Sequence, residues 1–305
     1  MGLYFFDKKK IIIIGSLLAC GYMVIFPEIT MRASKAAIDI WLNSIVPVIM
    51  PFFIAAGFLK GIGVCSNLPV RLYPFIMAML SGYPMGAKIT GDYYREGRIQ
   101  DDRIYGLLSY SMITGPAFIL GTVGVSLLNS YRMGVILAVS HYCGALLNGF
   151  LFGGYMSVKT DRVQNNTDSS SGVSYYSVLT EAMLDSFKSV AIILAYIMLF
   201  MIVCSTISES GICDGESGRL PEALINGIME MTVGCGKMAA SGESSLIKLL
   251  SVSFMISFGG FSVLGQSLSM LKNCPVTASK LMKIKISHGL ISVIISFVIC
   301  RFVII

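Results

Sequence analysis

Two short segments of this chain combine glycines with polar side chains, and each ends in a lysine. Residues 81–88 read Ser-Gly-Tyr-Pro-Met-Gly-Ala-Lys, and residues 230–237 read Glu-Met-Thr-Val-Gly-Cys-Gly-Lys. Pro84 removes a backbone donor and restricts Tyr83, so a helix must end there, and the free N–H groups at such a break favour carboxylates or phosphates. The two segments therefore predict contacts to a bound solute, from Ser81, Gly82, Tyr83, Lys88, Glu230, Thr232 and Lys237.

Each segment also has a simpler interpretation. Residues 81–84 can form only a turn, with Lys88 extending its side chain to the membrane interface. Glu230 stands in an apolar stretch, where a carboxyl group is costly and therefore counts as a functional candidate. It can neutralise Lys237, hold a cation or a proton, contact the solute, or simply lie at the outer interface.

A second pair of segments is a duplicated motif. Met-Ile-Thr-Gly-Pro at 112–116 recurs, with one inserted residue, as Met-Ile-Ser-Phe-Gly-Gly at 255–260. Both copies interrupt long apolar runs, and Pro116 leaves the carbonyl group near Met112 without its helical donor. Unwound backbone and hydroxyl groups predict that these segments line the solute path, against packing of small residues between helices. The candidates are Thr114, Gly115, Ser257, Gly259, Gly260, Ser262 and Gln266.

The two histidines of the chain follow these motifs at similar distances, as Ser140-His141 and Ser287-His288. Imidazole titrates near neutral pH, so His141 and His288 are candidates for a proton relay. The alternative is that each side chain forms a hydrogen bond with a neighbouring helix.

Composition indicates an integral membrane protein. Of the 305 residues, 55% are hydrophobic and 13% are charged, whereas soluble domains carry about 25% charged residues. The net charge of +6 is therefore assigned to one face of a lipid bilayer rather than to a nucleic-acid partner. The eight cysteines form no Cys-x-x-Cys pair, so no metal site is expected. Because hydrolase, zinc-peptidase and P-loop signatures do not occur, we expect no catalytic residues, no cofactor and no enzyme activity.

The apolar runs predict an all-α polytopic membrane protein. Runs that approach the length of a bilayer span fall near 10–27, 43–64, 104–128, 132–156, 187–208, 246–271 and 284–305. The shorter runs 73–88 and 223–240 predict re-entrant hairpins beside a solute path. Each half then contains a span, a re-entrant hairpin, a broken span and a span. Three crossings in each half, about 3+3 spans, predict an inverted-topology internal repeat.

The corresponding division of the chain has four parts. These are an N-terminal transmembrane helix and loop at 1–40, a gate-type repeat at 41–156, a cytoplasmic linker at 157–180 and a second gate-type repeat at 181–305. Most lysines and arginines then fall on one face, Lys88 and Lys285 among them, which predicts a cytoplasmic N-terminus and an external C-terminus. For the first helix, Leu-Leu-Ala-Cys at 17–20 leaves a lipoprotein signal acylated at Cys20 as the alternative.

Several of these motifs, in order and over nearly the whole chain, resemble the sporulation integral membrane protein family. They are residues 81–88, Gly115 to Gly124, His141-Tyr142, Glu230-x-Thr232-x-Gly234, and Gly259-Gly260-Phe-Ser262 with Gln266. This family is a branch of the nucleoside-recognition gate-domain superfamily and is related to concentrative nucleoside transporters. The resemblance implies transport of dipicolinic acid, a small planar dianion, out of the mother cell across the outer forespore membrane during sporulation. It also implies alternating access at the paired hairpins and broken helices.

Two departures from the family pattern concern solute preference. Met112, Ile113 and Thr114 precede Gly-Pro where family members tend to carry Asn or Ser, and the residues from Val263 to Gly265 are apolar or small where a polar residue is common. A nucleoside or cation carrier and a non-transporting sporulation membrane organiser are the alternative functions. Beside the solute and the bilayer, a homo-oligomer or a sporulation membrane partner is expected. Energy coupling by protons, by sodium or by facilitated flow stays open.

Overall fold

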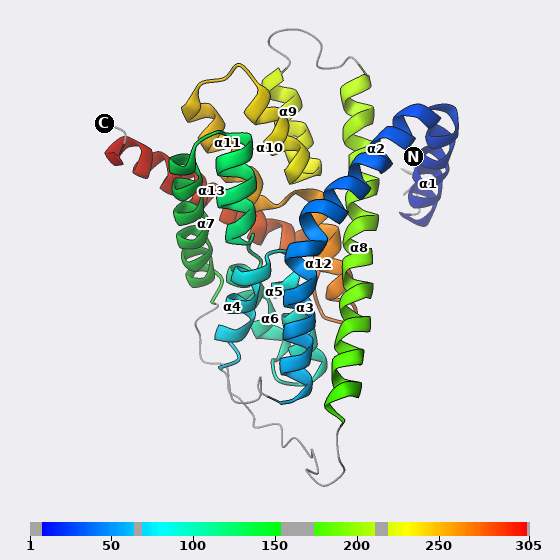
Figure 1. The fold of residues 1–305 in the computed structure, drawn as a ribbon, viewed down its shortest axis with the longest axis vertical. Helices are drawn as coiled ribbons and strands as arrows, with labels where there is room; N and C mark the ends of the chain where they lie inside the picture. The colour runs from blue at the N-terminus through cyan, green and yellow to red at the C-terminus, as the bar shows by residue number, and fades with distance from the viewer. Residues whose placement is uncertain (1–7, 64–68, 154–173, 211–218, 304–305) are drawn as a thin grey trace, which may run out of the picture.

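The computed structural model describes residues 8–63, 69–153, 174–210 and 219–303 (Figure 1). The regular elements of this part of the chain are all helical. In the first half they are α1 (Lys8–Ile25), α2 (Pro27–Ile40), the π-helical η1 (Trp41–Ile45), α3 (Val46–Gly61), α4 (Leu72–Ser81), α5 (Met85–Arg95), α6 (Asp101–Ser111), the π-helical η3 (Ala117–Leu127) and α7 (Tyr131–Leu151).

The second half follows a similar order of long and short helices. It contains α8 (Tyr175–Glu209), α9 (Arg219–Met229), α10 (Met231–Ala240), α11 (Ser245–Phe258), α12 (Gly260–Met270) and α13 (Ala278–Val303). In each half a long helix precedes two short helices joined by a tight turn. A helix interrupted at its middle and a further long helix then follow. The interruptions fall between α6 and η3 and between α11 and α12, at the duplicated motif.

Five helices in the described residues are long and apolar enough to cross a membrane, so the chain is an integral membrane protein. They cover Pro27–Gly61, Tyr131–Leu151, Tyr175–Glu209, Ser245–Met270 and Ala278–Phe302. The expected span at 104–128 is divided at residues 112–116, so neither α6 nor η3 reaches this length alone. The expected first span forms α1, a shorter apolar helix at the edge of the bundle (Figure 1).

Residues 27–40, which the sequence analysis assigns to a loop, are helical. Pro27 occupies the first turn of α2 and Glu28 lies in the same turn, and both choices suit a helix N-terminus. Through η1, α2 continues into α3 as one span of 35 residues. The expected linker at 157–180 overlaps the start of α8 at Tyr175, and its residues 157–173 lie outside the described part of the chain.

The two pairs of short helices occupy opposite ends of the bundle. In Figure 1, α4 and α5 lie in the lower half and α9 and α10 in the upper half, and their turns approach each other near the middle. Pro84 ends the first turn between α4 and α5, as the sequence predicts, and Glu230 forms the second turn between α9 and α10. Each helix of the two pairs has only 10 or 11 residues, so none of them is long enough to span a bilayer of ~30 Å.

The second pair depends on a glycine at a close approach of backbones. A Cβ atom on Gly234 of α10 would lie 2.1 Å from the Cα atom of Gly227 in α9. Gly236, two residues further along α10, has no such neighbour within 4 Å. Gly234 therefore permits the helix pair to close, whereas Gly236 does not contribute to this contact.

We expect Gly234→Ala and Gly236→Ala to change stability in opposite directions. Gly234→Ala forces the two backbones apart and is expected to lower the free energy of unfolding by about 3 kcal/mol. Gly236→Ala gains helix propensity at no steric cost and is expected to raise it by up to about 1 kcal/mol. Thermal unfolding of both purified variants in detergent measures the difference. Equal unfolding temperatures for the two variants would contradict this packing of α9 on α10.

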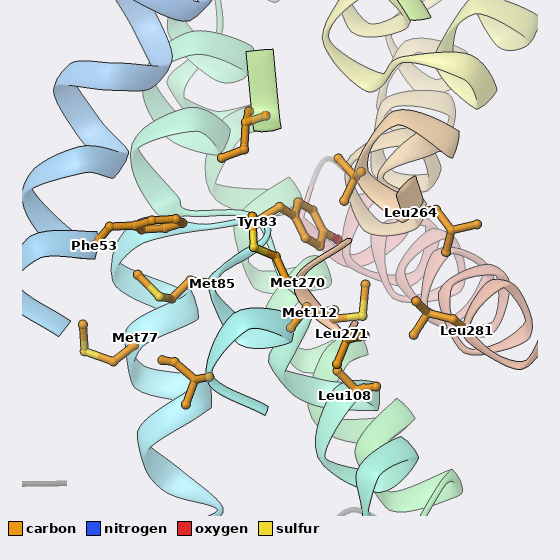
Figure 2. Close-up of a cluster of buried hydrophobic side chains, with 14 of the residues drawn as sticks. Phe53, Met77, Tyr83, Met85, Leu108, Met112, Leu264, Met270, Leu271 and Leu281 are labelled. Atoms are coloured by element: carbon orange, nitrogen blue, oxygen red, sulfur yellow. The ribbon is translucent and has the colours of Figure 1, made fainter. Parts of the chain in front are cut away.

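The largest apolar core surrounds the turn between α4 and α5. It includes Phe53, Tyr83, Met112 and Leu264, all of which are buried. Figure 2 shows Tyr83 at the centre of this cluster, with Phe53 on one side and Leu264 on the other. Residues from both halves of the chain therefore hold the first turn in place.

Candidate functional site

A cavity of about 410 Å³ lies where the two turns approach each other. Its wall is built from the first turn (residues 80–83), the first helix interruption (Thr114 and Gly115), the second turn (residues 230–232) and parts of α2, η1, α3, η3, α8 and α12. The volume is within the range of roughly 300–1,000 Å³ that is typical of small-molecule sites. Like such sites, the cavity has a mostly apolar wall with a few polar groups.

Eight of the candidate solute contacts line this cavity. They are Ser81, Gly82, Tyr83, Thr114, Gly115, Glu230, Thr232 and Gln266. Residues that are distant in the sequence and lie in both halves of the chain therefore meet at one place. Ser262 accepts a hydrogen bond from the Gln266 amide at 3.1 Å behind the wall, and Ser257, Gly259 and Gly260 also lie outside the lining.

Neither candidate lysine lines the cavity. Lys88 donates a hydrogen bond to the Ser189 hydroxyl of α8 at 2.7 Å. Lys237 forms an ion pair with Glu222 and donates a second hydrogen bond to the Ser208 hydroxyl at 2.9 Å. The positive charges that the sequence analysis places at the solute are therefore engaged elsewhere in this conformation.

Glu230 is the carboxyl group of the cavity wall. It is 2% exposed, and its Oε2 atom accepts the Val233 backbone N–H at 2.9 Å, which caps the N-terminus of α10. It forms no ion pair within the described residues, and Lys237 pairs with Glu222 instead. This side chain lies at the buried turn between α9 and α10, and its role at a solute site or at the outer interface stays a prediction.

His141 joins the two helix interruptions. Its Nε2 atom accepts the Thr114 backbone N–H at 2.9 Å, so its Nδ1 atom carries the proton and donates to the Ser257 hydroxyl at 2.8 Å. The Thr114 hydroxyl donates to the Ile256 carbonyl oxygen at 3.0 Å. The Thr114 hydroxyl thus bonds directly to the second interruption, and His141 bridges the Thr114 N–H to the Ser257 hydroxyl. Irregular backbone is tolerated inside a membrane where its polar groups find partners in this way.

Tyr83 makes a second connection between the halves. Its hydroxyl lies 3.3 Å from the carbonyl oxygens of both Ile256 and Ser257, to which it donates. The ring lies at the cavity wall beside Gly82, whose φ is +82°. A Cβ atom on Gly82 would approach the Gly115 backbone nitrogen to 2.8 Å. Only glycine therefore allows the first turn to pack against the first interruption.

The sequence analysis missed the side chain that fills the first interruption. It places Lys285 on the inner face, but this residue of α13 is 1% exposed. Its Nζ atom donates to the Met112 carbonyl oxygen at 2.8 Å and to the Tyr83 hydroxyl oxygen. The Met112 carbonyl group is the one predicted to lose its helical donor. Because Lys285 precedes His288 by three residues, both lie on one face of a helix, and this spacing was the available signal.

His288 lies between Lys285 and His141. Its Nε2 atom is 2.9 Å from the His141 carbonyl oxygen, an acceptor, so Nε2 carries the ring proton. Its Nδ1 atom is 3.4 Å from the Lys285 Nζ atom. The ring nitrogens of both histidines are therefore engaged behind the cavity wall, in an arrangement that fits hydrogen bonds to neighbouring helices. The proton relay stays a prediction.

The described residues contain no group of three or more His, Cys, Asp or Glu side chains that could hold a metal ion. The described residues that line the cavity offer apolar area, hydroxyl and amide groups, helix N-termini and one carboxyl group, Glu230. This chemistry suits reversible binding of a small molecule.

The chain is similar to a sporulation membrane protein. It is 25% identical over 321 residues to the sporulation integral membrane protein YlbJ of Bacillus subtilis (strain 168). The alignment covers 88% of this chain and 78% of that protein. No family model matches the chain, and no solved structure matches it.

Proposed function

We propose that this protein is a membrane transporter that carries a small solute through the cavity between its two halves. The observation that supports this most strongly is the meeting of both short-helix turns and the first helix interruption around one cavity. Irregular backbone within a membrane is found where it is buried in protein or lines a cavity. Solute sites formed by discontinuous helices near the membrane midplane are typical of transporters. We therefore propose binding and transport rather than catalysis.

The proposed solute is dipicolinate, moved out of the mother cell across the outer forespore membrane during sporulation. Two lines of support agree: the resemblance in motifs and the similarity to a protein named for sporulation. The nearby N-termini of α10 and η3 place backbone N–H groups beside the cavity, because Met231 and Ala117 line it. Such helix ends favour carboxylates.

The proposed mechanism is alternating access between two inverted repeats. The similar order of helices in the two halves and the opposite placement of the short pairs support it (Figure 1). One half would rock against the other around the bound solute. In this arrangement the N-terminus is cytoplasmic and the C-terminus lies outside.

A nucleoside or cation carrier is the second candidate, and one observation favours it. Glu230 is buried in the cavity wall, and no lysine or arginine of the described residues lines that wall. A lone carboxyl group suits a cation or a neutral polar solute better than an unaccompanied dianion.

Solute uptake by liposomes that contain the purified protein separates the two candidates. We expect dipicolinate to enter these liposomes faster than it enters empty ones, and uridine to enter both at the same rate. Uridine uptake without dipicolinate uptake would support the second candidate and contradict the first. Uptake of neither solute by folded, inserted protein would contradict both.

A further inference from the structure

Lys285 places its amino group in the interior of the protein, and no carboxylate of the described residues pairs with it. The residue is 1% exposed and takes part in none of the ion pairs of the described residues. Burying an uncompensated charge is costly. Such a residue is retained only where its hydrogen bonds stabilise something that the fold needs.

The three partners of Lys285 account for all three protons of an ammonium group. The Met112 carbonyl oxygen can only accept. The Tyr83 oxygen accepts from Lys285 when the Tyr83 hydroxyl proton points to the carbonyl groups of Ile256 and Ser257, each 3.3 Å away. The His288 Nδ1 atom must accept as well, because Nε2 of that ring carries the proton. The geometry thus matches a charged lysine with three acceptors.

These acceptors are the kind of ligands that hold a free cation in other membrane proteins. Carbonyl groups of an unwound helix, together with hydroxyl oxygens, coordinate Na⁺ in transporters built from discontinuous helices. Here the carbonyl group freed by the interruption between α6 and η3 faces a side chain of the same chain. We propose that Lys285 is a built-in cation, and that its ammonium group takes the place of a dissociable ion and positions the first turn against the first interruption.

The inference goes beyond the proposed transport function, because it concerns how the cavity wall is assembled and what ions it needs. Tyr83 lines the cavity and touches Lys285, so Lys285 is a positioning residue that acts through Tyr83. The first interruption therefore needs no bound alkali-metal ion. Its test measures the unfolding temperature rather than solute flux, so the result does not depend on which solute the protein carries.

The test is chemical rescue of Lys285→Ala, which leaves a hole beside the three acceptors. We expect its unfolding temperature in detergent to fall by roughly 5 °C or more in tetramethylammonium chloride. Ammonium or methylammonium chloride at the same ionic strength is expected to restore at least half of that loss, because these ions fit the hole and donate protons. The wild-type protein and Lys283→Ala, an exposed lysine of the same helix, are expected to unfold at the same temperature in all three salts.

Three outcomes decide the inference. Rescue by the small ammonium ions alone supports a built-in cation. A loss of stability that is identical in all three salts would overturn it and leave Lys285 with a packing role only. An unchanged unfolding temperature in Lys285→Ala would overturn it as well. If Lys285→Ala does not fold, Lys285→Ser leaves a similar hole, keeps one O–H donor and replaces it in the same titration, with the same expected and contradicting results.

Discussion

Gly82→Ala is expected to abolish solute flux and to lower the unfolding temperature. The backbone of Gly82 has φ +82° and ψ −164°, a region that is essentially restricted to glycine. The new Cβ atom would also lie 2.8 Å from the backbone nitrogen of Gly115. Strain and clash together are expected to cost about 3 kcal/mol or more, at the point where the first turn forms the cavity wall. Flux in liposomes and thermal unfolding in detergent measure the two effects.

Gly97→Ala is the matched control for backbone strain. Gly97 also has a positive φ, +70°, but has no neighbour within 4 Å of an added Cβ atom. This variant is expected to lose some stability and to keep its flux. If Gly82→Ala transports as well as Gly97→Ala, the first turn does not pack against Gly115 during transport, and this account of the cavity wall is wrong.

Glu230→Gln is expected to raise dipicolinate flux at neutral pH roughly tenfold or more when metal cations are absent. A carboxylate in the wall repels a dianion, and two unit charges 4 Å apart interact by about 4 kcal/mol at an effective dielectric constant of about 20. In the wild-type protein a proton or a cation must offset this repulsion. Glutamine keeps the shape of Glu230 and an oxygen that can cap Val233.

The measurement is dipicolinate flux as a function of pH and Ca²⁺ concentration, with neutral uridine as the control solute. Wild-type flux is expected to rise at lower pH or with added Ca²⁺, and this dependence is expected to disappear in Glu230→Gln. Uridine flux, if present, should be the same in both proteins. Lower dipicolinate flux in a stable Glu230→Gln protein would instead make Glu230 a direct binding contact and contradict the repulsion.

The sequence predicts helix ends well where a proline or a glycine determines the backbone conformation. Pro84 cannot continue a helix, and the first pair of short helices turns there. Gly259 takes a left-handed conformation and divides α11 from α12, as the duplicated motif predicts. The apolar runs likewise predict the long helices, because a bilayer span needs a minimum length.

Positions of long charged side chains could not be predicted in the same way. A lysine can extend to the interface, pair with a carboxylate or be buried, and the choice depends on residues distant in the sequence. Lys237 meets Glu222 across the α9–α10 pair, and Lys88 meets Ser189 on α8. Lys285 meets Tyr83, 202 residues away. Residues 27–40 are predicted to be a loop for a different reason. A segment of moderate hydropathy can form an amphipathic helix or a loop, and hydropathy alone does not distinguish the two.

The central claim is that solute passes through the cavity between the two halves, and a cavity-filling substitution tests it most directly. Thr122 lines the cavity, whereas Val125 on the same helix, η3, is 50% exposed at the outer surface of the bundle. We predict that Thr122→Trp abolishes dipicolinate flux in liposomes, and that Val125→Trp, the matched control, transports like the wild-type protein. Wild-type flux through folded Thr122→Trp would show that the solute takes another route and would contradict the account.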